Sequence, residues 1–105
     1  MRIEEKREGS KATVSLEGRL DTVTTPEVTA ALEGTLDGVS ELILELSGLE
    51  YVSSAGLRLI LTLHKQMNAK NGRLVVRNST PGVRDVLEMT GFTDFLALEN
   101  VPGEA

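Results

Sequence analysis

The most informative part of the chain is the segment Leu49-Glu50-Tyr51-Val52-Ser53-Ser54-Ala55-Gly56-Leu57-Arg58-Leu59-Ile60-Leu61. Before it, residues 41–46 are apolar enough to form a strand buried on both faces, as in a parallel sheet. We predict that residues 47–52 form a loop leading to a helix that begins near Ser53 and Ser54 and runs to about Ala69. Apolar side chains recur there at spacings of three and four, which predicts a buried face of Leu57, Ile60, Leu61, His64 and Met67.

Upstream of this segment, the sequence predicts a hairpin followed by a helix. Residues 12–17 alternate apolar and polar side chains, as in a half-buried strand, and Gly18 is expected to end it. Residues 2–7 are the expected partner strand, joined to it by a tight turn. Thr25 and Pro26 suit the N-cap and first position of a helix. The apolar stripe expected for this helix consists of Val28, Ala31, Leu32 and Leu36, with Gly38 as its stop.

Downstream, two more strands and a third helix are expected. Asn71-Gly72 closes the long helix, and residues 73–77 form a short strand. Thr80-Pro81 repeats the cap and proline of the first helix, and Gly91 stops the third helix. Residues 95–98 are the expected last strand. The expected buried face of the third helix consists of Val83, Val86, Leu87 and Thr90.

Strands that alternate with helices predict an α/β fold with right-handed crossovers. We expect a four- to five-stranded mixed sheet, parallel in its later strands, with helices packed against it. A length of 105 residues corresponds to one domain. That domain is expected to span residues 1–105, with residues 1–2 and 100–105 as frayed ends.

Composition narrows the classes of function. A net charge of −5 argues against binding to nucleic acid, and no apolar run approaches the roughly 20 residues that span a bilayer. The first residues lack the apolar region of a secretory signal. With one histidine and no cysteine, the chain is expected to form neither a disulfide nor a transition-metal site. It also lacks the glycine-rich phosphate-binding motifs, so we expect no cofactor.

A serine hydrolase does not fit the sequence. His64 follows Ser54 by ten residues in the same predicted helix, which is roughly 15 Å along the axis at about 1.5 Å per residue. That separation is far beyond hydrogen-bond reach, and the chain has no Gly-x-Ser-x-Gly elbow. We therefore predict no catalytic residue and interpret His64 as a packed side chain.

The pair Ser53-Ser54 supports two interpretations that spacing alone leaves open. In one, a serine oxygen accepts hydrogen bonds from the unpaired N–H groups of the first helical turn. In the other, the same N–H groups and the positive end of the helix dipole favour a phosphate. A phosphoserine would add nearly two negative charges and change what the surface binds.

Motifs in the right order resemble those of STAS-domain anti-sigma factor antagonists. They are Gly18-Arg19-Leu20-Asp21, then Tyr51-Val52-Ser53-Ser54-Ala55-Gly56-Leu57-Arg58-Leu59-Ile60-Leu61, then Gly72-Arg73-Leu74-Val75-Val76. Pro81-Gly82-Val83, followed by Leu87 and Gly91-Phe92, also fits the family. The resemblance extends from Thr13 to about Phe95.

The resemblance implies a non-enzymatic, cytoplasmic, bacterial regulator in a partner-switching system. The unphosphorylated antagonist of such a system binds an ATP-using anti-sigma factor serine kinase, which otherwise sequesters a sigma factor or another target. The kinase then phosphorylates the antagonist, and a phosphatase resets it. The family's phosphoacceptor position falls on Ser54 and its nearby acid on Asp21. The implied protein is a monomer when unbound and contacts neither nucleic acid nor membrane.

One position departs from the family pattern. The family has an acid immediately before the phosphoacceptor, where this chain has Ser53. This departure makes Ser53 a second candidate for modification. It also leaves open an alternative function, a STAS module that binds a protein or ligand without a phosphorylation cycle.

The resemblance places the docking surface over the start of the long helix, residues 18–25 and the adjacent loop. Leu59 and Leu63 lie off the predicted apolar stripe, which leaves two interpretations. Either the helix packs on two sides, or these leucines are exposed and form with Arg58 an apolar patch rimmed by charge. On the second interpretation, Leu59→Glu weakens partner binding and leaves the fold intact. The predicted partner-binding residues are Asp21, Thr22, Ser53, Ser54, Ala55, Gly56, Arg58 and Leu59.

Overall fold

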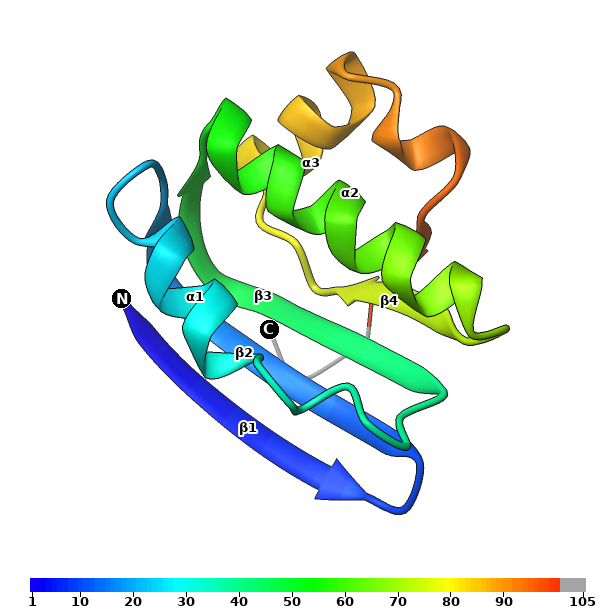
Figure 1. The fold of residues 1–105 in the computed structure, drawn as a ribbon. Coiled ribbons are helices and arrows are strands. Elements are labelled where there is room, and N and C mark those ends of the chain that lie inside the picture. The colour runs from blue at the N-terminus through cyan, green and yellow to red at the C-terminus, as the bar shows by residue number, and fades with distance from the viewer. Residues whose placement is uncertain (101–105) are drawn as a thin grey trace.

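The computed structural model of the chain describes residues 1–100, which form a five-stranded sheet covered by three helices (Figure 1). The strands lie side by side in chain order, with β1 antiparallel to β2 and the other neighbours parallel. This arrangement confirms the predicted mixed sheet with parallel later strands. In chain order the elements are β1 (Arg2–Glu8), β2 (Lys11–Leu20), α1 (Thr25–Ala31), β3 (Glu41–Val52), α2 (Ser54–Ala69), β4 (Arg73–Arg77), α3 (Pro81–Met89), a 3-10 turn (Phe92–Asp94) and β5 (Ala97–Glu99).

The helices pack on one face of the sheet. Each parallel connection moves one strand in the same direction, and right-handed crossovers of this kind place every helix on the same side. Buried side chains of all three helices share one cluster with alternate residues of the strands. From β3 they include the leucines at positions 42, 44 and 46, because side chains of a strand alternate between faces, and further along the strand Leu49 and Val52.

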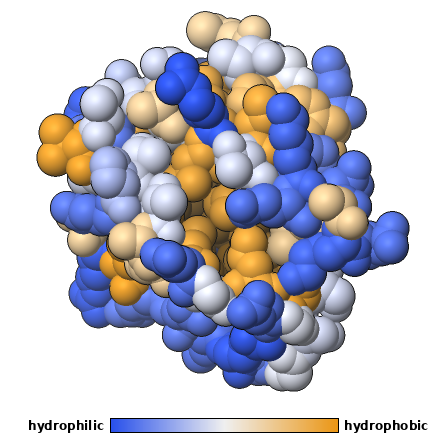
Figure 2. All heavy atoms as spheres, viewed as in Figure 1, coloured by the Kyte–Doolittle hydropathy of each residue, from blue (hydrophilic) through white to orange (hydrophobic). Residues whose placement is uncertain are grey.

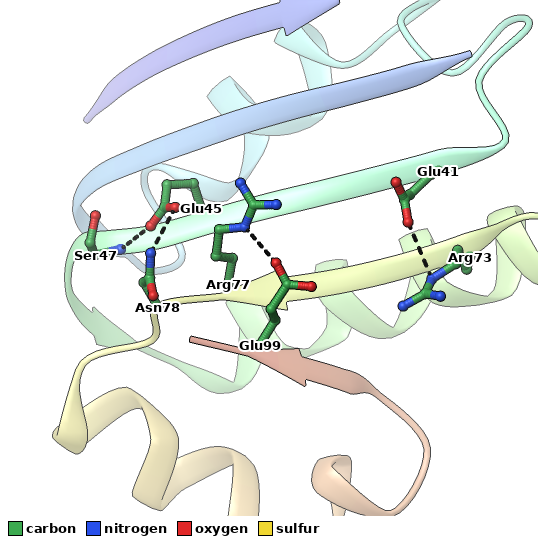
Figure 3. Close-up of polar contacts among 7 residues, drawn as sticks. All are labelled: Glu41, Glu45, Ser47, Arg73, Arg77, Asn78 and Glu99. Atoms are coloured by element: carbon green, nitrogen blue, oxygen red, sulfur yellow. Dashed lines mark hydrogen bonds and ion pairs between the residues drawn. The ribbon is translucent and has the colours of Figure 1, made fainter. Parts of the chain in front are cut away.

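The opposite face of the sheet carries polar and charged side chains along β3, β4 and β5 (Figure 3). The carboxylate of Glu45 accepts hydrogen bonds from Ser47 N and Asn78 Nδ2, each at 3.2 Å. Ion pairs join Arg77 to Glu99 at 3.0 Å and Arg73 to Glu41 at 3.5 Å. This face is therefore suited to contact with water, and the apolar core lies on the helical side.

Two strands are longer than the sequence predicts. β2 continues through Gly18 to Leu20, and β3 covers residues 47–52, where we expected a loop. Gly18 adopts φ 111°, and the pairing of β2 with β3 shifts register at two places near it. Glycine in a strand accommodates such a bulge, so it bends this strand instead of ending it.

The first helix is shorter than expected and starts one residue earlier. Its N-cap position is Thr24 instead of Thr25, and the helix ends at Ala31, whose side chain is exposed. The chain then passes through successive turns to Gly38, with positive φ at Gly34 and Gly38. Glycine adopts positive φ without steric cost, so these residues replace the predicted last turn of helix.

The long helix has the predicted length but a different buried face. Its buried residues are Gly56, Leu59, Ile60, Leu63 and Met67, whereas Leu57, Leu61 and His64 are only half-buried. Leu59 and Leu63 are 9% and 4% exposed because α1 and the turns after it pack beside them. The helix therefore packs on two sides, and the expectation of an exposed leucine patch is wrong.

An apolar groove remains between α1 and α2, and Figure 2 shows it as a hollow on the helical face. It encloses about 400 Å³. Leucine side chains from both sides of the groove form much of its wall, namely Leu32, Leu36, Leu59 and Leu63.

Smaller expectations are also corrected. In α3, Thr90 is exposed instead of buried, since Val83 and Leu87 already form the inward face. The last strand begins at Ala97, after the 3-10 turn. Arg2 is paired in β1 and not frayed. The expectation of a frayed C-terminal end covers residues 100–105, of which 101–105 lie outside the described residues. No helix within residues 1–100 has the length and apolar character needed to cross a membrane.

Candidate functional site

The candidate site lies at the edge of the sheet where β2 and β3 end. Leu20 and Val52, the last residues of these parallel strands, are paired. Ser53 N donates a hydrogen bond of 2.9 Å to Leu20 O. The residues that follow directly, Asp21 after β2 and Ser53 and Ser54 after β3, therefore emerge at one edge, as expected for parallel strands.

The two serines have different surroundings. Ser53 is the N-cap of α2, with extended backbone (φ −94°, ψ 177°), and its Oγ accepts a hydrogen bond of 3.3 Å from Gly56 N. Ser54 is the first residue of the helix and is exposed. Among the hydrogen bonds within residues 1–100, none involves the Ser54 hydroxyl. Ser53 is thus the residue that caps the helix, and Ser54 is the residue with an exposed hydroxyl.

Gly56 allows the start of α2 to press against both strand ends. A Cβ atom at this position would lie 2.8 Å from Leu20 Cγ, 2.8 Å from Val52 Cγ2 and 2.9 Å from Leu20 O. Contacts below 3.0 Å are not tolerated by real Cβ atoms, and one of these is with backbone. Only glycine fits without displacing the helix from the sheet.

Asp21 organises the turn that leads into α1. Its Oδ1 accepts hydrogen bonds of 3.0 Å from Thr24 N and Val23 N, and Thr24 Oγ1 lies 3.2 Å away. The hydrogen bond from Thr24 N is the largest cause that lowers the pKa of Asp21 below its ordinary value. The hydrogen bonds from Val23 N and Thr24 Oγ1 and the charge of Arg19 lower it further. Asp21 is therefore an anion with a fixed orientation at the site.

Thr24 completes this turn and was not singled out by the sequence. Its Oγ1 donates to Arg19 O at 2.6 Å and accepts from Asp21 N at 2.9 Å. The signal was its position three residues after Asp21, the spacing at which a short polar side chain closes a turn onto the backbone.

The structure brings most of the predicted partner-binding residues to this edge. Thr22, Ser54 and Arg58 are exposed, and Ala55 is half-buried. Leu59 does not belong with them, because its side chain is in the core.

Three exposed side chains in these segments were not among the named partner-binding residues. The guanidinium of Arg19 lies over the ring of Tyr51, 4.2 Å from Cζ to the ring centroid. Val23, on the Asp21 turn, is 77% exposed. Arg19 belongs to the quoted Gly-Arg-Leu-Asp motif, but its contact with Tyr51 depends on strand register, which the motif does not reveal.

The chemistry of the site is that of a modification and binding surface. His64 lies away from the edge, where its ring packs 4.8 Å from that of Phe95. No group of three or more His, Cys, Asp or Glu side chains within residues 1–100 is placed to hold a metal ion. The edge offers an exposed hydroxyl at the positive end of a helix, beside a fixed carboxylate and a stacked guanidinium.

Comparison with known proteins agrees with this geometry. The STAS domain family matches residues 2–105. BtrV of Bordetella bronchiseptica, which carries the name of an anti-sigma factor antagonist, is 35% identical over 86 residues, covering 81% of this chain and 74% of BtrV. The anti-sigma-B factor antagonist of Listeria monocytogenes is 27% identical and covers 94% of this chain and 88% of its own.

Solved structures show the same fold. The crystal structure of an anti-sigma factor antagonist from Mycobacterium paratuberculosis superimposes with a TM-score of 0.83 at 23% identity, over 93% of this chain and 84% of that one. The chain belongs to the STAS domain family and, within it, to the non-enzymatic anti-sigma factor antagonists.

Proposed function

We propose that this chain is a cytoplasmic anti-sigma factor antagonist, monomeric when unbound, that binds an ATP-using anti-sigma serine kinase. Phosphorylation of Ser54 by that kinase ends the interaction, and a phosphatase restores it. The observation that supports this proposal is the division between the serines. Ser53 caps α2, whereas Ser54 is exposed in the first turn with a hydroxyl that no described hydrogen bond occupies.

The nature of the partner is supported by the relatives. The Listeria monocytogenes relative is named as an antagonist of the anti-sigma-B factor, and it aligns over almost the whole chain. The docking surface is the edge formed by the start of α2 and the Asp21 turn. This is where the exposed Thr22 and Arg58 lie.

A phosphate on Ser54 changes this surface without requiring a change in backbone conformation. The first turn of α2 has unpaired N–H groups and the positive end of the helix dipole, which favour an anion. The phosphate blocks docking by its bulk and by placing charge near Asp21. Where the partner brings an acidic group to within a few ångströms of the phosphate, the repulsion costs about 1–4 kcal/mol near a surface. This corresponds to about a five- to several-hundred-fold loss of affinity.

A capture experiment from the native cytoplasm tests the proposal. The baits are wild type, Ser54→Ala, Ser54→Asp and, as a matched control, Ser53→Ala, which removes the neighbouring hydroxyl. An ATP-binding kinase is expected with wild type, Ser54→Ala and Ser53→Ala, and not with Ser54→Asp. Incubation of wild type with that kinase and ATP is then expected to add one phosphate, located on Ser54 by mass spectrometry.

A different result favours the second function. Because Ser53 replaces the family's acid, the chain has an observed feature that fits a STAS module without a phosphorylation cycle. If all four baits retain the same partner and the kinase adds no phosphate to Ser54, the switch is contradicted. The chain then acts as a constitutive protein-interaction or ligand-binding module.

A further inference from the structure

The stacked pair of Arg19 and Tyr51 is an exposed, pre-formed contact beside the proposed switch. The two residues are paired across β2 and β3, and each lies one position before the end of its strand. Arg19 is exposed, and the side chain of Tyr51 is 41% exposed. In Figure 1 the connection from β2 to α1 and the start of α2 lie at this same edge. The adjacent residues Leu20 and Val52 point into the core, so Arg19 and Tyr51 point to the opposite face of the sheet. The pair lies at the ends of the two strands that lead to Asp21 and Ser54.

The guanidinium of Arg19 retains its capacity to bind a carboxylate. Within residues 1–100, no ion pair or side-chain hydrogen bond of Arg19 accompanies its contact with the Tyr51 ring. The carboxylate of Asp21 is instead occupied by Thr24 and Val23. The planar fork of N–H donors in a guanidinium matches a carboxylate, and no described side-chain hydrogen bond of Arg19 occupies it.

Exposed apolar side chains are few, and half of the large ones border this edge. Within the described chain they are Val23, Tyr51, Met89 and Phe95. Val23 is in the turn that follows β2, and Tyr51 is the second-last residue of β3, shortly before α2 begins. Aromatic and arginine anchors next to apolar contacts are typical of the residues that dominate binding energy at protein interfaces.

Resting on the function proposed above, we propose that Arg19, Tyr51 and Val23 anchor the anti-sigma partner. The partner presents a carboxylate, from Asp or Glu, to the guanidinium of Arg19 and an apolar surface to Tyr51 and Val23. This assignment also gives the switch a direct electrostatic basis. A phosphate on Ser54 repels the partner's own carboxylate at the edge where Arg19 would bind it.

Binding measurements with the purified kinase captured by the wild-type bait test this assignment. The variants are Tyr51→Ala, Arg19→Ala, Arg19→Lys and Val23→Ser, measured by isothermal titration calorimetry. Tyr51→Ala and Arg19→Ala are each expected to weaken binding by about ten-fold or more. Arg19→Lys keeps the charge but lacks the planar fork, so it is expected to recover only part of the affinity.

Two residues serve as matched controls. Phe95 is 42% exposed, almost the same as Tyr51, but packs against His64, which is ten residues along α2 from Ser54. Met89 is an exposed apolar residue at the end of α3 and matches Val23. Phe95→Ala and Met89→Ser are expected to bind within about two-fold of wild type, as residues outside an interface do.

The sole tyrosine provides a readout of contact that is independent of affinity. Because Tyr51 is the only tyrosine in the chain, labelling with 3-fluorotyrosine gives a single ¹⁹F resonance. This resonance is expected to shift on addition of the unlabelled kinase. Wild-type affinity in Arg19→Ala and Tyr51→Ala, or a ¹⁹F signal that does not move, overturns the assignment.

The results distinguish failure of the Arg19 and Tyr51 anchor from failure of the proposed function. If Tyr51→Ala weakens binding while Ser54→Asp does not, the anchor stands and only the phosphorylation switch fails. If wild type binds no anti-sigma kinase, the anchor fails together with the proposed function. The fold of each variant is checked by circular dichroism. If Arg19→Ala does not fold, Arg19→Lys still tests whether the planar guanidinium of Arg19 is needed for binding.

Discussion

At the scale of single residues, the two adjacent serines differ in what they contribute. Ser53 accepts a hydrogen bond from Gly56 N and so stabilises the first turn of α2. Ser54, exposed at the first helical position, has no comparable role. A side chain without a structural role is free to be modified without loss of the fold.

This difference predicts unequal effects on stability. Ser53→Ala is expected to lower the free energy of unfolding by about 1 kcal/mol, the usual value of an N-cap. Ser54→Ala is expected to change it by less than about 0.5 kcal/mol, as at most exposed positions. Urea denaturation of the two variants measures both values. Equal losses would contradict the assignment of the cap to Ser53.

Gly56 gives a second prediction at this scale. Gly56→Ala is expected to destabilise the protein by about 2 kcal/mol or more, because its Cβ would overlap backbone and core side chains. Gly82, in α3, is a matched control, since nothing lies within 4 Å of the Cβ that it would gain. Gly82→Ala is expected to be neutral or to add up to about 1 kcal/mol from helix propensity. Thermal unfolding of the pair distinguishes these outcomes, and similar losses in both would argue against the close contact.

The contribution of Asp21 to the stability of the fold depends on pH. Its pKa is lowered from the ordinary value of 3.8 in the folded state, first by the hydrogen bond from Thr24 N. The unfolded state therefore binds a proton more readily, so the stabilisation is present above pH 3.8 and is lost as the pH falls through the lower folded pKa. Asp21→Asn cannot titrate and is expected to show a weaker loss of stability as the pH falls below 3.8. Urea midpoints of both proteins across that range measure the difference, and parallel curves would contradict it.

At the scale of elements, α2 is held on two sides. One side of the helix packs on the sheet and the other against α1 and its following turns, which is why Leu59 and Leu63 are buried. The earlier expectation that Leu59→Glu changes binding alone is therefore replaced by an effect on the fold.

Leu59→Glu is now expected to lower the free energy of unfolding by about 3 kcal/mol or more, because it buries an unpaired carboxylate. Arg58→Glu, on the exposed neighbour, is expected to stay within about 0.5 kcal/mol of wild type. Guanidinium denaturation compares the two. A Leu59→Glu variant as stable as wild type would show that this side of α2 is open after all.

The sequence predicts these elements well where their signals are local. The start of α2 at the serine pair, its end at Asn71-Gly72 and the proline that starts α3 were recognised, because each of these signals acts on its own few residues. The extension of β2 through Gly18 was missed, since glycine ends a strand or bends one depending on the neighbouring strand. The contact of Arg19 with Tyr51 was missed for the same reason. The register shift after Gly18 places Arg19 opposite Tyr51 instead of Glu50.

At the scale of the whole molecule, the helices cover one face of the sheet and the site occupies one edge. The ion pairs of the polar opposite face, Arg73–Glu41 and Arg77–Glu99, do not include Asp21, Ser53 or Ser54 of that edge (Figure 3). A change at the edge can therefore alter binding while the rest of the protein keeps its structure.

We predict that phosphorylation of Ser54 leaves the backbone nearly unchanged. In ¹⁵N-correlated spectra of the protein with and without phosphate, shift changes are expected within residues 18–25 and 50–59. Residues of β1, β5 and the C-terminal half of α2 are expected to keep their positions. Changes spread across the whole sheet would instead indicate a conformational mechanism.

The close packing of Gly56 against the ends of β2 and β3 affects the time that the protein needs to respond to phosphorylation. A helix start that has no room to move adds no slow rearrangement between the covalent change and its effect. On the proposed mechanism, the response time is then the lifetime of the complex or the turnover of the kinase, whichever is longer. The kinase would therefore set the response time, and this chain would add no slow conformational step.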